Sequence, residues 1–182
     1  SDHTAFRNQI AAFSKNYQVI LVDLAGHGRS PMPEGRLSAE VFAKGVEKVV
    51  RRVKGQGSGV KNTLIGWSMG GRVALKFYEL YKELVGALVL VATTPHYLLS
   101  DDYPWGMPKV YFESLKRRLR QDPQKGLNYF RDLVFAKEMQ PKDIRAVFLS
   151  KNATRLETLF EAFDALEFED LRSIPPTVEV PT

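Results

Sequence analysis

The sequence predicts an α/β fold: part of a parallel sheet with crossover helices, joined to an inserted helical cap. Over residues 1–96, helical and strand patterns alternate, as such a sheet requires. Over residues 97–172, prolines separate several helical patterns and no strand pattern occurs. We therefore expect a core over 1–96, a cap over 97–172 and a return to the core over 173–182, with the next strand only beginning near Thr182.

The first part of the expected core contains one helix and one strand. Phe6, Ile10 and Phe13 recur at helical spacing. The apolar run over residues 18–22 predicts a buried strand that stops at Asp23. A loop rich in glycine and proline follows, as is typical after a strand.

The second part of the expected core contains two strands and two helices. Ser38 is placed to cap a helix that ends at a glycine-rich segment. The apolar residues of this helix recur on one face: Phe42, Val46, Val49, Val50 and Val53. Residues 63–66 predict a short strand and residues 70–81 a helix. Residues 87–92 predict a strand of continuous apolar character, which is typical of a strand covered on both faces.

The composition excludes several classes of protein. The chain has 182 residues, 44% of them hydrophobic, which is enough for a packed core. It has no apolar run of about 18 residues and no basic stretch leading into an apolar one at its start, so we expect no membrane span and no signal peptide. Zero cysteines exclude disulfides and thiol catalysis and favour a cytoplasmic location. The net charge of +5 permits an acidic partner but does not indicate nucleic-acid binding, and no metal or nucleotide cofactor is indicated.

Ser68 carries the strongest chemical signal of the sequence. It lies in the pattern Gly-x-Ser-x-Gly over residues 66–70, directly after an expected strand and before an expected helix. In so tight a turn, small residues flank the serine two positions away on either side, and the serine oxygen is pushed out over the sheet edge. The backbone N–H of Met69 can then bind the oxyanion of a tetrahedral intermediate, while its side chain lines the pocket. The pattern therefore predicts Ser68 as a nucleophile.

Two segments resemble the α/β-hydrolase family. VDLAGHGRS over residues 22–30 is similar to the glycine-rich loop of these enzymes, and GWSMGG over residues 66–71 is similar to their nucleophile elbow. A narrower likeness lies in residues 87–110 (ALVLVATTPHYLLSDDYPWGMPKV), continues through 130–134 and ends near 170–172. These segments resemble the pimeloyl-acyl-carrier-protein methyl ester carboxylesterases of biotin synthesis, strongly in the first hundred residues and weakly in the cap.

The resemblance implies a serine carboxylesterase acting on a small acyl ester, namely a methyl ester of a carrier-bound acyl chain. Ser68 would be the nucleophile, the Met69 amide the oxyanion donor and Trp67 a pocket wall. The acyl-binding part of the cap would be Phe130, Arg131, Asp132, Leu133 and Val134. Acyl carrier proteins are acidic, so cap arginines could dock one, unless they only form a solvated helix face. These arginines are Arg117, Arg118, Arg120, Arg131, Arg145 and Arg155.

The groups that would activate Ser68 are not found at the family's positions. The family places an oxyanion loop before the first expected helix, and the triad aspartate and histidine after the strand that would begin near Thr182. The chain's histidines are His3, His27 and His96, and none fits the family order of serine, acid, histidine. Without its base, Ser68 should be nearly inert.

Two interpretations of different classes remain. In the first, the chain is most of an esterase whose flanking segments are removed or supplied by another chain. In the second, it is a non-catalytic piece that binds an acidic partner through its basic cap. Within the first, a thioesterase, a lipase or a carbon–carbon bond hydrolase shares the same elbow. The oligomeric state is not predicted.

Overall fold

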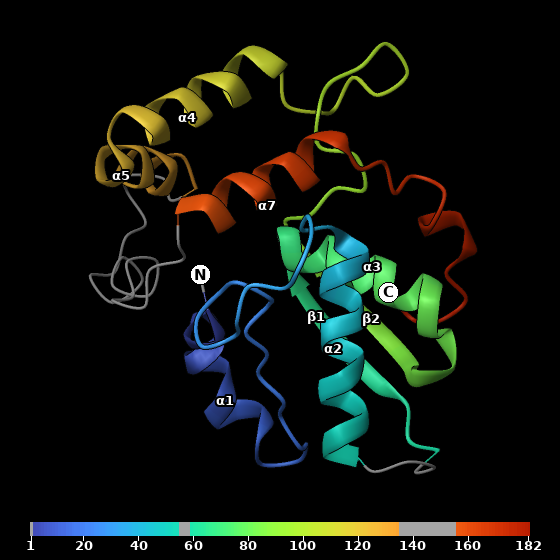
Figure 1. Ribbon diagram of the computed structural model, residues 1–182. Helices are drawn as coiled ribbons and strands as arrows, with labels where there is room; N and C mark the ends of the chain where they lie inside the picture. The colour runs from blue at the N-terminus through green and yellow to red at the C-terminus, as the bar shows by residue number, and fades with distance from the viewer. Residues whose placement is uncertain (1, 55–58, 135–155) are drawn as a thin grey trace. The chain divides into compact units, whose positions relative to one another are not determined.

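The computed structural model describes residues 2–54, 59–134 and 156–182. The elements, in chain order, are η1 (His3–Phe6), α1 (Arg7–Phe13), α2 (Ala39–Lys54), β1 (Asn62–Trp67), α3 (Met69–Tyr81), η2 (Lys82–Leu84), β2 (Val85–Val91), α4 (Lys109–Gln121), α5 (Pro123–Val134), α7 (Leu156–Phe168) and η3 (Pro175–Thr177) (Figure 1). By its internal contacts the chain divides into a unit of residues 1–34 and 109–160 and a unit of residues 35–108 and 161–182. None of the described helices is long and apolar enough to cross a membrane.

The unit of residues 35–108 and 161–182 is built on two parallel strands joined by a helix. β1 pairs with β2 from Thr63 opposite Ala87 to Trp67 opposite Val91. The connecting helix α3 packs against both strands, and α2 packs against α3 (Figure 1). Parallel strands require such a crossover connection. The order β1, α3, β2 is the strand–helix–strand unit that the sequence predicted.

Apolar side chains at helical spacing form the core of this unit. Phe42 and Val50 of α2 are buried, as are Val73 and Phe77 of α3, and they lie with Leu88 of β2 among the least exposed residues. Burial of each such side chain contributes about 1.5–3 kcal/mol. Ser38 caps α2 as expected.

The Ser38 cap is formed by its hydroxyl oxygen, which accepts a hydrogen bond from the Val41 N–H at 3.0 Å. At the other end of the same helix Val53 is exposed, unlike the rest of the predicted apolar face. The helix therefore buries its first three turns more completely than its last.

One face of the two strands is exposed. Ile65, Val89 and Val91 keep 42%, 42% and 44% of their surface in contact with solvent. Alternate residues of a strand point to opposite faces, so these three side chains lie opposite the face that α3 covers. The prediction that 87–92 is covered on both faces is therefore wrong for the described residues.

The C-terminal residues lie along β2. The Leu88 N–H donates to the Pro181 carbonyl at 2.9 Å, and the Glu179 N–H donates to the Tyr78 hydroxyl at 3.0 Å. The first bond places Pro181 beside β2 and the second places Glu179 beside α3, which is consistent with the expected return of the chain to the core. The bounds of core and cap stay a prediction.

The predicted strand over residues 18–22 is wrong. Residues 18–24 adopt neither helix nor strand, and most are only half-buried. A strand exists only as part of a hydrogen-bonded ladder, and the described residues of the unit that contains 18–22 include no other strand. An apolar run alone did not reveal whether a partner was present.

The unit of residues 1–34 and 109–160 contains α4 and α5, two of the helices expected after residue 97. α4 packs against α5 (Figure 1). The contact is close because α5 brings Gly126 against α4, where an added Cβ would lie 2.7 Å from the Leu119 Cα. Phe112, Leu115 and Leu119 form the buried face of α4.

The turn between β1 and α3 is tightly packed. Ser68 lies there with φ 53° and ψ −119°. A Cβ at Gly66 would overlap the Gly70 carbonyl, and a Cβ at Gly71 would lie 2.5 Å from the Thr93 Cγ2. At Gly70, by contrast, an added Cβ meets no described atom within 4 Å. The glycine that this turn needs on the helix side is therefore Gly71, and the space argument made for Gly70 from the sequence is wrong.

We predict opposite effects for two alanine substitutions in this turn. Gly71→Ala should lower the free energy of unfolding by about 1–3 kcal/mol, because the new methyl group overlaps the Thr93 side chain. Gly70→Ala is the matched control, and it should be neutral or stabilising by up to about 1 kcal/mol because alanine favours the helix. Urea unfolding monitored by circular dichroism measures both values. Equal destabilisation by the two substitutions would contradict the assignment.

Candidate active site

Ser68 occupies the point where β1 ends and α3 begins, and it is exposed. Its backbone is strained, since a positive φ is uncommon for a residue with a Cβ and costs about 1–3 kcal/mol. Hydrogen bonds hold both of its backbone polar groups. The N–H donates to the Val91 carbonyl at 2.9 Å, and the carbonyl accepts from the Gly71 N–H at 2.9 Å. The same carbonyl accepts from the Thr93 hydroxyl at 2.7 Å.

Met69 is the first residue of α3. The first N–H groups of a helix have no carbonyl partner within the helix, and the helix dipole makes this end positive. The turn therefore places an exposed hydroxyl next to a helix end that favours negative charge. Such an arrangement can stabilise the oxyanion formed when a serine attacks a carbonyl carbon.

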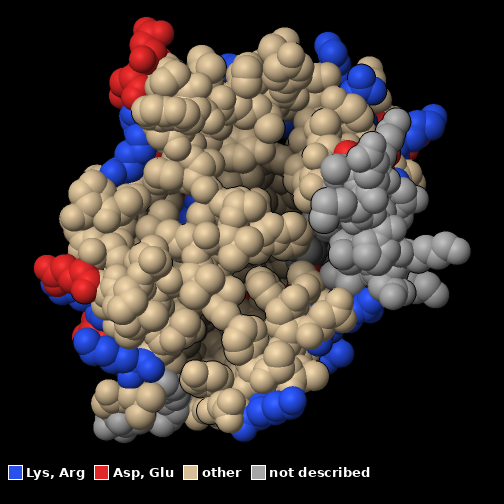
Figure 2. Space-filling view, turned by 180° about the vertical axis from the view of Figure 1, so that it is seen from behind, with Lys and Arg blue, Asp and Glu red and all other residues tan. Residues whose placement is uncertain are grey.

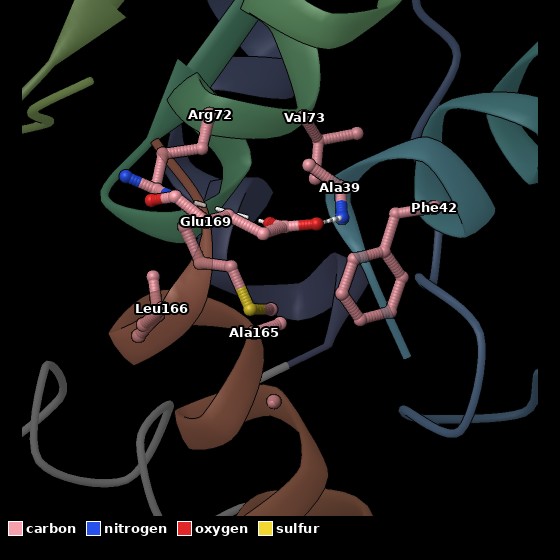
Figure 3. Close-up of a pocket in the computed structure, with 9 residues that line it drawn as sticks. Ala39, Phe42, Arg72, Val73, Ala165, Leu166 and Glu169 are labelled. Atoms are coloured by element: carbon pink, nitrogen blue, oxygen red, sulfur yellow. Dashed lines mark hydrogen bonds and ion pairs between the residues drawn. The ribbon is translucent and has the colours of Figure 1, made fainter. Parts of the chain in front are cut away.

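Met69, which is half-buried, is one of the residues that line a small cavity (Figure 3). This cavity has a volume of about 10 Å³. A cavity needs roughly 10–15 Å³ to hold a single water molecule, so this space cannot take an acyl chain. Its lining residues are Ala39, Phe42, Met69, Arg72, Val73, Ala162, Ala165, Leu166 and Glu169.

Arg72 is the functional neighbour that sequence reasoning missed. Its side chain is 2% exposed, and its guanidinium donates to the Pro95 carbonyl at 2.8 Å and to the Glu169 carbonyl at 2.8 Å. The Glu169 carboxylate lies 3.9 Å away and accepts a hydrogen bond from the Ala39 N–H at 2.8 Å (Figure 3). Burial raises the pKa of Glu169 above its ordinary value.

Arg72 thereby links the first turn of α3 to the chain beyond β2 and to the residue that follows α7. All of these groups belong to one unit. The only hint in the sequence was a single arginine directly after Gly71 and before the apolar residues of α3. Such a signal does not distinguish a buried arginine from a surface one.

His96 lies beyond β2 in the same unit as Ser68. Its Nδ1 is buried without a hydrogen-bond partner among the described residues, and the Asp170 carboxylate is 4.0 Å away. Arg172 binds Asp170 at 2.6 Å and Asp102 at 2.8 Å. The hydrogen bonds from Arg172 lower the pKa of Asp170 to about 2. Both carboxylates are thus paired with Arg172.

The other two histidines belong to the unit of residues 1–34 and 109–160. The His3 N–H donates to Asp23 at 2.6 Å, and the His3 Nδ1 lies 2.8 Å from the same carboxylate oxygen. Burial acts to raise the pKa of Asp23, but hydrogen bonds from the Arg29 and His3 amides hold it below its ordinary value. His27 is buried, and its Nδ1 lies 3.0 Å from the Ala25 carbonyl.

The predicted site residues fall into three groups: those around Ser68, the expected acyl-binding residues and the expected docking arginines. Trp67, Ser68 and Met69 are brought together at the end of β1. The expected acyl-binding residues 130–134 form the last turns of α5, where Leu133 is 57% exposed. The Arg131 guanidinium is bound to Asp132 at 3.0 Å within α5.

Three of the six predicted docking arginines lie on α4. Arg117, Arg118 and Arg120 are exposed there. Arg118 stacks over the Tyr129 ring at 4.6 Å, and Arg120 stacks over the Phe160 ring at 5.0 Å. Arg145 and Arg155 lie outside the described residues. On the face shown in Figure 2, Lys and Arg side chains occur around the margin and are not gathered into one patch.

No group of three or more His, Asp or Glu side chains in the described part of the chain is arranged to hold a metal ion.

Comparisons with known proteins show which family the chain belongs to. Residues 2–165 match the family model of the alpha/beta hydrolase fold. The chain is 30% identical over 170 residues to pimeloyl-(acyl-carrier protein) methyl ester esterase of Nitrosomonas europaea, covering 90% of this chain and 63% of that protein. It is 31% identical over 173 residues to the protein of the same name from Shewanella woodyi, covering 91% of this chain and 62% of that protein.

Among solved structures, an esterase from Exiguobacterium antarcticum superimposes with a TM-score of 0.86 at 30% sequence identity. The match covers 99% of this chain and 67% of that one. The chain thus spans less than two thirds of the length of the two named curated relatives. It matches the family model over most of its own length, and the chain belongs to the alpha/beta hydrolase fold family.

Proposed function

We propose that this chain carries the nucleophile of a serine carboxylesterase and that Ser68 is that nucleophile. The observation that supports the proposal most is the backbone of Ser68, which is held at a positive φ between a strand and a helix. A strained serine at this position exposes its hydroxyl and lies beside the N–H of the next residue. Membership of the alpha/beta hydrolase fold family adds to this support.

The proposed reaction has two steps. The Ser68 oxygen attacks the ester carbonyl carbon, and the Met69 N–H binds the oxyanion that forms. The carbon–oxygen bond to the alcohol then breaks, and the alcohol leaves with the proton taken from Ser68. Water then attacks the acyl-enzyme, the bond between the acyl carbon and the Ser68 oxygen breaks, and the acyl group leaves as a carboxylic acid while Ser68 regains its proton.

A base is needed to carry that proton. We propose that a histidine oriented by an aspartate supplies it from outside these 182 residues, as the resemblance implies. Within the unit that contains Ser68, the sequence has one histidine, His96. The Asp170 carboxylate, 4.0 Å from its Nδ1, is already bound by Arg172.

The proposed substrate is a methyl ester of an acyl chain carried on an acyl carrier protein, as in biotin synthesis. The names of the two curated relatives support this choice. We propose that Trp67 forms a wall of the acyl pocket and that residues 130–134 contribute to its cap. The acidic carrier would dock on the arginines of α4, all three of which are exposed.

We predict that ester hydrolysis by the chain depends on Ser68 and on an added base. The chain should hydrolyse p-nitrophenyl butyrate slowly, and free imidazole should raise the rate because it can take the place of the missing base. Ser68→Ala should remove this increase and leave only the reaction of imidazole itself with the ester. Release of p-nitrophenol at 405 nm, followed at several imidazole concentrations, measures the effect.

Ser100→Ala is the control, since Ser100 is bound to Asp102 at 2.7 Å. It should behave as the unchanged chain does. An imidazole effect that survives Ser68→Ala would refute the nucleophile assignment. A folded chain that shows no such effect would favour the interpretation as a non-catalytic binding piece.

We also predict that charge reversal on α4 weakens binding of acyl carrier protein. Arg117→Glu should raise the Kd about threefold or more in low salt, because one attractive charge becomes repulsive, and the difference should shrink in about 0.5 M salt. Lys125→Glu is the matched control on α5, where Lys125 is exposed and paired with Asp122 at 3.2 Å. Isothermal titration with acyl carrier protein gives both Kd values. An equal loss in the two variants would indicate only a general charge effect.

A further inference from the structure

A second strained residue stands beside the Ser68 turn. Among the described residues, Ser68 and Ala92 are the two residues other than glycine with a positive φ, at 53° and 45°. Ala92 directly follows β2, whose last residue is paired with the last residue of β1. The two strained residues therefore lie at the same end of neighbouring strands. Strain of this kind persists only where surrounding contacts over-determine it.

The turn at Ala92 places the Thr93 side chain beside the Ser68 carbonyl. The Thr93 hydroxyl donates to that carbonyl at 2.7 Å. On its other side, the Thr93 Cγ2 is so close to Gly71 that an added Cβ there would lie 2.5 Å from it. One side chain thus contacts the residue before α3 and the first turn of α3.

The end of β2 therefore holds both polar groups of the Ser68 backbone. Val91 accepts the Ser68 N–H at 2.9 Å, and Thr93, two residues later, donates to the Ser68 carbonyl. These two bonds act across neighbouring segments. The bond from Gly71 to the same carbonyl lies within the turn itself. The bonds from Val91 and Thr93 thus connect the Ser68 backbone to the segment at the end of β2.

We propose that Thr93 is a positioning residue for Ser68. The Thr93 hydroxyl holds the Ser68 carbonyl in place and so sets the direction in which the Ser68 side chain leaves the turn. This inference rests on the proposed function, since it assigns Thr93 a part in the reaction of Ser68. It adds a residue 25 positions away in the sequence to the support of the nucleophile.

The competing explanation is that Thr93 serves only as packing against Gly71. Two substitutions separate these roles. Thr93→Val keeps the shape and the methyl group but removes the hydroxyl, and the Ser68 carbonyl keeps its bond from Gly71, so the fold should survive. Thr93→Ser keeps the hydroxyl and removes the methyl group. A positioning role requires the serine variant, and not the valine variant, to behave as the unchanged chain does.

The test measures amide hydrogen exchange at Ser68 and Gly71, together with the Ser68-dependent, imidazole-assisted hydrolysis of p-nitrophenyl butyrate. Thr93→Val should speed both exchange rates and lower kcat by about threefold to tenfold, the range for loss of one hydrogen bond, with KM unchanged. Thr93→Ser should restore both. Thermal unfolding midpoints of the two variants should be alike.

Several results would overturn the inference. They are unchanged exchange in Thr93→Val, an equal effect in Thr93→Ser, or an effect explained by a lower unfolding midpoint. Failure of the proposed function shows separately, because Ser68→Ala would then leave the hydrolysis rate unchanged. In that case the exchange rates alone still decide whether Thr93 holds the Ser68 backbone.

Discussion

The left-handed backbone of Ser68 is the constraint on which the rest of this structure depends. A serine does not adopt such a conformation without compensation, so the surroundings must supply about 1–3 kcal/mol. The Ser68 N–H is bound to Val91, and the Ser68 carbonyl accepts two further hydrogen bonds. Gly66 and Gly71 allow the chain to pack closely around the turn. The parallel pairing of β1 with β2 matters because it brings Val91 and Thr93 to this turn.

A second layer of support acts through α3. If the first turn of the helix moved, the N–H groups beside Ser68 would move with it. Arg72 prevents this by binding backbone carbonyls beyond β2 and at the end of α7. Removing the guanidinium would take a donor from the carbonyl of the half-buried Glu169, which is costly, whereas the Pro95 carbonyl would keep its bond from the Leu171 N–H. Arg72 therefore connects the fold of this unit with the geometry of the candidate site.

Local patterns in the sequence predicted the parts of the site that are local. The strand, the serine and the helix follow one another within about twenty residues, so residues 62–81 were predicted nearly as they are observed. Thr93 and Arg72 were not predicted, because their roles arise from contacts between segments that the sequence does not show to be neighbours. The failed strand at 18–22 has the same cause, since pairing depends on another strand. The sequence led us to assign the space requirement to Gly70 and not to Gly71. The Thr93 side chain is what crowds Gly71, and the sequence does not show that the two residues are neighbours.

The central claim is that this turn makes Ser68 the reactive serine of the chain. Labelling with a fluorophosphonate in the presence of imidazole, followed by tryptic digestion and mass spectrometry, tests it directly, since the peptide of residues 62–72 contains Ser68 as its only serine. We expect a single adduct on that peptide, absent from Ser68→Ala. An adduct on another peptide, one that survives the substitution, or a folded chain that takes no label would contradict the claim.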